Sequence, residues 1–188
     1  MLRILFVTVL AIVPTILANP SSLSAQADYG TLNPAAPPQT SQFSFIIGKW
    51  DCKTKSMTPN GEYNEGHATW TGSYILDGWA IQDLWVTKGS KGSFYGLNIR
   101  SFNKTLGKWD NRWLPQGTLE WKHYDSEMVG DNMVMTGGEG TDQRGPYVDR
   151  NTFFEIGKDS WRWRKDRSWD GGETWFEGIA FIDATRVD

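Results

Sequence analysis

The chain has 188 residues, including 11 Trp, 9 Phe and 6 Tyr, and a single Cys. Its formal net charge of −3 argues against nucleic acid as a partner, because proteins that contact phosphate backbones carry a basic field. One Cys, Cys52, excludes an internal disulfide, and the chain is long enough for one domain with its own core.

The first 27 residues have the pattern of an export signal. Arg3 gives a positive start, residues 4–17 are largely apolar, and Ala25-Gln26-Ala27 fits a small-x-small cleavage site. The apolar run is shorter than the roughly 20 residues that span a bilayer. We therefore expect a signal peptide over residues 1–27, no membrane span after its cleavage, and a periplasmic or secreted protein.

Residues 28–42 are rich in Pro, Ala, Ser and Thr and contain one aromatic residue, Tyr29. A segment of this composition buries too little apolar surface to order itself. We expect a disordered leader over residues 28–42, followed by a single domain over residues 43–188.

That domain reads as about ten short strands separated by turn residues, and no stretch keeps a helical period. Asp77-Gly78 is typical of a two-residue hairpin, and a Gly-rich loop is expected over residues 137–145. The predicted strands are Ile46–Ser56, Glu62–Leu76, Trp79–Lys88, Ser93–Phe102, Lys108–Leu114, Leu119–Ser126, Asn132–Gly137, Tyr147–Ile156, Ser160–Ser168 and Thr174–Ile182. This rhythm predicts an all-β fold, an antiparallel up-and-down barrel of about ten strands.

Alternation along the strands places aromatic and polar side chains on shared faces. A plain core excludes most polar groups, since each buried one needs a partner. Two interpretations stay open: the mixed faces line a wet cavity, or the aromatic residues form cross-strand pairs on the outside. The mixed faces are Trp79, Ile81, Asp83 and Trp85; Trp109, Asn111 and Trp113; Leu119, Trp121, His123 and Asp125; and Trp161, Trp163, Lys165 and Arg167.

The basic strand around residue 165 has three interpretations. Arg162 and Arg164 form a solvated outer face, or they pair with carboxylates on adjoining strands. Alternatively, Lys165 and Arg167 point inward with the neighbouring Trp residues and hold an anionic ligand.

Two short motifs resemble known ones. Gly48-Lys49-Trp50, after an apolar Phe-Ile-Ile, resembles the Gly-x-Trp that opens lipocalins and related calycin barrels. Residues 168–175, Ser-Trp-Asp-Gly-Gly-Glu-Thr-Trp, match the Asp-box hairpin of sialidase-type propellers, in which Asp accepts turn N–H groups and Gly supplies a positive φ. The chain has one copy and no repeat at propeller spacing, so we interpret the box as structural.

Over Phe43–Val187 the chain resembles an uncharacterised family of bacterial, often exported proteins with a lipocalin-like calycin β-barrel. The resemblance lies in residues 45–50, in Ile75-Leu76-Asp77-Gly78, in Arg150, and in Asp159-Ser160-Trp161 ahead of the Asp-box. It implies the barrel and no particular activity. The nitrobindin-like barrels, a neighbouring calycin group, bind haem through a His near the C-terminus, and no His follows His123 in this chain. No haem or other cofactor is therefore expected.

These patterns favour a binding protein over an enzyme. Neither His67 nor His123 has the spacing of a metal pair, and no Gly-x-Ser-x-Gly is present, so no metal site is predicted. The leading hypothesis is an aromatic-lined cavity for a small, partly apolar ligand, neutral or anionic. The candidate ligand-binding residues are Trp85, Trp121, His123, Arg150 and Trp163.

Two alternatives stay open. One is an enzyme of isomerase or hydrolase type that uses an acid–base group in the same cavity, with His123 or Asp83 as the catalytic candidate. The other is a packed barrel without a pocket that acts through its surface. The sequence leaves the identity of the ligand and the oligomeric state open.

Overall fold

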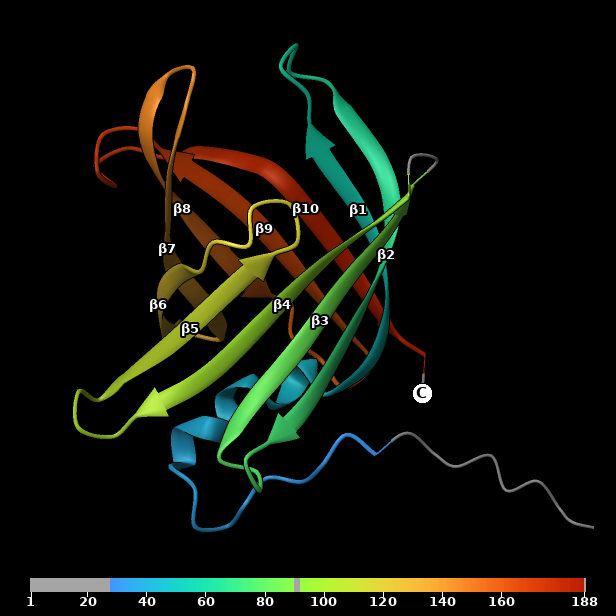
Figure 1. Cartoon of the computed structure of the whole chain (residues 1–188), viewed down its shortest axis with the longest axis vertical. Helices are drawn as coiled ribbons and strands as arrows, with labels where there is room; N and C mark the ends of the chain where they lie inside the picture. The colour runs from blue at the N-terminus through green and yellow to red at the C-terminus, as the bar shows by residue number, and fades with distance from the viewer. Residues whose placement is uncertain (1–27, 90–91, 188) are drawn as a thin grey trace, which may run out of the picture.

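The computed structural model describes residues 28–89 and 92–187, and the predicted signal peptide lies outside them. Within these residues ten strands follow one 3-10 helix, and sequential strands pair antiparallel. β1 also pairs with β10, which closes the sheet (Figure 1). The predicted all-β, up-and-down barrel of about ten strands is therefore confirmed. The elements are η1 (Pro38–Ile46), β1 (Gly48–Met57), β2 (Tyr63–Ile75), β3 (Ala80–Gly89), β4 (Gly92–Asn103), β5 (Lys108–Pro115), β6 (Lys122–Val129), β7 (Asn132–Asp142), β8 (Gly145–Phe154), β9 (Ser160–Ser168) and β10 (Phe176–Arg186).

Some strand boundaries differ from the prediction because of bulges and turns. The Gly-rich loop expected over residues 137–145 is largely strand, since β7 continues to Asp142 through a shift in register within the glycine run. β6 begins at Lys122 and not at Leu119, which lies in the preceding turn with a φ of 54°. The glycine run in β7 therefore indicates a bulge, and the turn residues before β6 indicate a turn longer than predicted.

The leader expected to be disordered follows a defined course against the barrel. The Asn33 N–H donates to Gly78 O (3.3 Å), and the Tyr74 N–H donates to Tyr29 O (2.8 Å). Gly78 permits this close approach, since a Cβ there would meet the backbone of Thr31. The composition argument considers side-chain burial alone, whereas backbone hydrogen bonds to the barrel hold this segment.

η1 covers one end of the barrel (Figure 1). Side chains of η1 belong to the aromatic core cluster. Phe43 and Ile46 of this segment have no exposed surface (0%). Trp50 Nε1 donates to Ile46 O (3.0 Å), and Trp109 Nε1 donates to Gln42 Oε1 (2.9 Å). These bonds satisfy indole N–H groups while their rings fill the core, so the end near η1 is closed.

The barrel interior holds polar side chains as well as aromatic ones. Asp83, Asn98, Asn111 and Asn151 are all at most 5% exposed. Their strands alternate as predicted, so each shares an inward face with aromatic or apolar neighbours. In β3 and β5 the mixed faces therefore point into the barrel, as the first of the two interpretations predicts.

Candidate functional site

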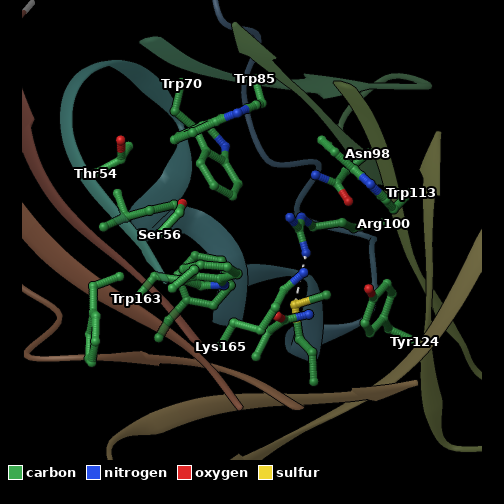
Figure 2. A pocket seen from close by; sticks show the side chains of 16 residues that line it. Thr54, Ser56, Trp70, Trp85, Asn98, Arg100, Trp113, Tyr124, Trp163 and Lys165 are labelled. Carbon is green, nitrogen blue, oxygen red and sulfur yellow. Dashed lines mark hydrogen bonds between the residues drawn. The ribbon is translucent and has the colours of Figure 1, made fainter. Parts of the chain in front are cut away.

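A cavity of about 220 Å³ lies in the barrel beyond the packed end. Side chains from strands all around the barrel converge on it (Figure 2). Its aromatic lining consists of Trp70, Trp85, Trp113, Tyr124, Phe153, Trp163 and Phe181. Its polar lining consists of Thr54, Ser56, Asn98, Arg100, Asn151 and Lys165.

The indoles of the cavity wall are held in place by other rings. Trp70 meets Trp85 edge to face, with ring centroids 5.4 Å apart and planes at 75°. Trp113 lies over Gly96 of the neighbouring strand, where a Cβ would collide with the indole. Because only Gly leaves this space, the Trp113 ring can lie flat along the barrel wall. The wall thus offers flat, rigid surfaces to a planar ligand.

A buried ion pair forms part of the polar lining. The Arg100 Nε–H donates to Asp83 Oδ2 (2.6 Å), and the Asn98 amide donates to Asp83 Oδ1 (2.6 Å). The Arg100 and Asp83 side chains are 1% and 0% exposed. A third donor of Arg100 reaches Met135 Sδ (3.3 Å). This pair is compensated within the protein, so Arg100 contributes little net charge to the cavity.

Lys165 is compensated less completely. Its Nζ lies 3.4 Å from Asp149 Oδ2. Both oxygens of Asp149 already accept from Arg167, at 2.8 Å from Nε and 3.2 Å from Nη2. Burial lowers the pKa of the Lys165 ammonium, Asp149 opposes this effect, and the charge of Arg167 adds to it. Lys165 lines the cavity, and 27% of its side chain is accessible.

Two buried polar atoms of the lining have no hydrogen-bond partner among the described residues. They are Asn151 Oδ1 and Trp70 Nε1, on side chains of residues that are 5% and 6% exposed. Asn151 faces Lys165 directly in the β8–β9 register, so the acceptor and the ammonium lie on neighbouring strands. Tyr124 adds a phenol whose pKa is raised, mainly by burial, and which therefore stays protonated at neutral pH.

The structure brings together two of the five predicted ligand-binding residues, Trp85 and Trp163, which both line the cavity. Trp121 is 51% exposed and does not line it. The His123 side chain is 45% exposed, and its Nε2 lies 3.2 Å from Asp110 Oδ1 on the outer face. In β6 the inward side chains are therefore those of the residues that alternate with His123.

Arg150 lies on the outer face of the barrel. Its Nη2 contacts Asp166 Oδ2 (2.9 Å), and its guanidinium stacks on Trp175, 4.3 Å from the ring centroid. Asp166 is 0% exposed and also accepts from Arg164 Nη2 (3.0 Å) and from the Gly178 N–H (2.9 Å). This cluster holds the bulge of β10, which is a structural role.

The two catalytic candidates lie apart. Asp83 is inside the barrel and held by Arg100 and Asn98, whereas His123 is on the outside. The remaining cations of β9 divide between the faces, since Arg162 pairs with Glu155 (3.1 Å) outside while Lys165 lines the cavity. Among the described residues, no group of three or more His, Cys, Asp and Glu side chains is placed to hold a metal ion.

The hairpin of residues 168–175 is held by its own side chains. The Thr174 N–H donates to Asp170 Oδ1 (2.9 Å), and the Gly172 N–H donates to Ser168 Oγ (2.8 Å). Gly171 and Gly172 have φ values of 74° and 97°, as such a turn requires. Hydrogen bonds from Ser168 and Thr174 lower the pKa of Asp170. The motif fixes the connection between β9 and β10 and does not reach the cavity lining.

Reasoning from the sequence did not select Trp70, Asn98, Arg100 or Asn151 as site residues. Asn151 could have been selected from its position opposite Lys165, but that position is known only when the strand register is known. Trp70 lies between the small residues Ala68 and Gly72 on its face of β2, and the next large side chain on that face is Tyr74.

The fold and the cavity together define a closed β-barrel with an aromatic and partly polar interior. The structure of the S-type phycobiliprotein lyase CPES from Guillardia theta is similar, with a TM-score of 0.51 and 9% sequence identity. The match covers 78% of this chain and 90% of the lyase. At this identity the likeness shows the shared barrel fold alone.

No protein family matches the chain by sequence, and no curated protein sequence is similar to it. In the part of the chain that the structure describes, no helix is long and apolar enough to cross a membrane.

Proposed function

We propose that this protein binds a small, partly apolar molecule in the barrel cavity. The observation that carries the proposal is the cavity of about 220 Å³, walled by Trp side chains and edged by buried polar groups without partners. Ligand pockets combine a mainly aromatic wall with a few polar groups that orient the ligand. Asn151 Oδ1 and Trp70 Nε1 are buried atoms of the lining without a partner in the described chain, so a polar group of a ligand could bond to them.

The similarity to a phycobiliprotein lyase supports a barrel of this type and gives no reason to assign the activity of the lyase. We also propose that the protein acts outside the cytoplasm, because residues 1–27 read as an export signal. We propose as well that the chain is related to the exported lipocalin-like barrels that it resembles, and that residues 168–175 form a single structural Asp-box hairpin.

Intrinsic fluorescence tests the binding, since Trp70, Trp85 and Trp163 surround the cavity. Titration with a panel of lipids, phenolics and sugar acids is expected to shift or quench the emission for at least one class. The Ala180→Phe variant fills the cavity from its lining and is expected to abolish that response. Thr185→Phe, on the exposed face of the same strand, is the matched control and is expected to leave it intact. A flat response across the panel contradicts binding.

Export has its own test. Expression of the full chain in a bacterium with a periplasm is expected to give a periplasmic protein that begins at Asp28, as measured by intact mass. Retention of residues 1–27 in the cytoplasm contradicts the proposal.

A further inference from the structure

The chemistry of the cavity also limits the class of ligand, and the argument rests on the proposed binding function. The volume of about 220 Å³ is the first limit. A cavity of roughly 150 Å³ in another protein holds benzene, so this one suits a single ring with one or two small substituents. Fatty acids, steroids and tetrapyrroles are too large for it without rearrangement.

The wall sets the second limit. Trp70 and Trp85 meet at a steep angle and thus present both a face and an edge to the hollow. Trp163 of β9 and Phe153 of β8 add rings to the lining, and Phe153 meets Trp70 edge to face, with ring centroids 5.9 Å apart. Aromatic rings pack best on other flat rings, in offset or edge-to-face geometry. A planar ring therefore fits this cavity better than a branched aliphatic group of the same volume.

Charge sets the third limit. Arg100 is paired with Asp83, and Asp149 is shared between Arg167 and Lys165. An ammonium has three donors, and within the described residues Lys165 approaches a carboxylate at Asp149, at 3.4 Å. The charge of Lys165 is therefore incompletely neutralised. The carboxylates near the cavity are already paired with cations, so they would repel an anionic ligand little. A ligand carboxylate would complete the hydrogen bonding of Lys165.

A second observation marks the same end of the cavity as polar. Asn151, whose Oδ1 has no partner in the described chain, is opposite Lys165 on the adjoining strand. A polar group of the ligand next to Lys165 therefore meets an amide and not an apolar surface. Thr54 and Ser56 supply hydroxyl groups to the lining as well.

We infer that the ligand is a single-ring aromatic acid, held by its ring between the indoles and by its carboxylate at the Lys165 ammonium.

The test compares three probes by isothermal titration calorimetry: benzoate, its neutral isostere nitrobenzene, and acetate, which lacks the ring. Benzoate is expected to bind roughly tenfold or more tightly than either of the others, since a charge-assisted hydrogen bond and the ring burial each contribute about that factor. Lys165→Met is expected to remove the preference for benzoate over nitrobenzene and to leave nitrobenzene binding in place.

Lys55→Met is the matched control. Lys55 pairs with Glu65 on the outer face (3.0 Å) and does not line the cavity, so its loss is expected to preserve the preference. Equal binding of benzoate and nitrobenzene overturns the acid assignment and leaves the binding function standing. Benzoate no tighter than acetate overturns the aromatic part. If none of the three probes binds but another class in the fluorescence panel does, the aromatic-acid inference is wrong and the binding function stands. If nothing binds, the inference and the proposed binding function are both wrong.

Discussion

The two halves of the barrel interior use the same kind of side chain in different ways. Near η1, Trp161 lies within 5.6 Å of the ring centroids of Trp50, Trp70 and Phe153, so indole meets indole. Farther along the same strand, Trp163 borders a hollow. The side chains opposite explain the difference, because the inward face of β1 runs from a large Trp to small residues, in the order Trp50, Cys52, Thr54, Ser56. Because the inward side chains of β1 become smaller along the strand, a cavity remains in a barrel whose other walls are aromatic.

The two cations of the cavity lining also differ from each other. Asp83 serves one cation and one amide, at 2.6 Å from Arg100 Nε and 2.6 Å from the Asn98 amide nitrogen. Asp149 serves two cations, and the one that lines the cavity is the farther. A cation with a carboxylate of its own has little charge left for a ligand, whereas a cation that shares its carboxylate keeps part of its charge for one. The predictions below test whether these halves differ as described.

Asp83→Ala is expected to have the largest effect. It leaves the Arg100 guanidinium buried without its counter-ion, and breaking such a pair destabilises a protein by about 3–5 kcal/mol. The free energy of unfolding from urea denaturation measures the change. The control is Asp110→Ala, which removes an exposed pair and is expected to cost less than about 1 kcal/mol. Similar losses in the two variants contradict the compensated interior pair.

Trp161→Ala tests the packed half directly. Loss of this fully buried indole is expected to cost about 3–5 kcal/mol, because neighbouring rings on all sides hold the cavity open. Trp85→Ala removes an indole that already borders a hollow, so fewer contacts disappear and the loss is expected to be about 2 kcal/mol. Urea denaturation of both variants gives the comparison. A larger loss for Trp85→Ala indicates that the cavity wall is as tightly packed as the closed end.

Much of the fold followed from the sequence because alternation and turn residues are local signals. Alternation groups Trp79, Ile81, Asp83 and Trp85 on one face. The last three point inward, whereas Trp79 precedes β3 and is 39% exposed. Alternation cannot say which of two faces is the inner one when both are mixed. In β6 the face that carries Trp121 and His123 is outside.

The same limit applies to β8, where the sequence offers no reason to prefer Asn151 over Arg150 as the inward residue. Strand register decides it, since Asn151 pairs with the inward Lys165. The cavity itself is a small difference between the barrel volume and the summed side-chain volumes, and no local pattern encodes such a difference. Likewise, the packing of residues 28–37 depends on a donor, the Tyr74 N–H, and an acceptor, Gly78 O, that only the folded barrel provides.

Cys52→Ala is expected to have a moderate effect that depends on pH. Burial raises the pKa of the Cys52 thiol from 9.0 to about 12. Above pH 9 the unfolded chain therefore loses this proton before the folded one does, and stability falls as pH rises. At pH 10 the thiol is expected to cost wild type about 1.4 kcal/mol relative to pH 7. Urea denaturation of both proteins at the two pH values measures it. If the gap between wild type and Cys52→Ala is the same at both, Cys52 is accessible and the packed half is looser than described.

Lys165→Met is expected to have the smallest effect on stability and the opposite pH dependence. Asp149 keeps its two bonds to Arg167 in this variant, so the free energy of unfolding at pH 7 is expected to change by less than about 1 kcal/mol. The groups facing Lys165 are Asp149, Arg167 and Lys122, and the net result is a lowered pKa. The unfolded chain therefore binds the Lys165 proton more tightly, and wild type gains stability relative to Lys165→Met as pH approaches the ordinary lysine value of roughly 10.4. Measured in a Cys52→Ala background, this gain is separated from the thiol effect. A loss in place of a gain means that Asp149 fully neutralises Lys165, and the cavity then offers a ligand no free cation.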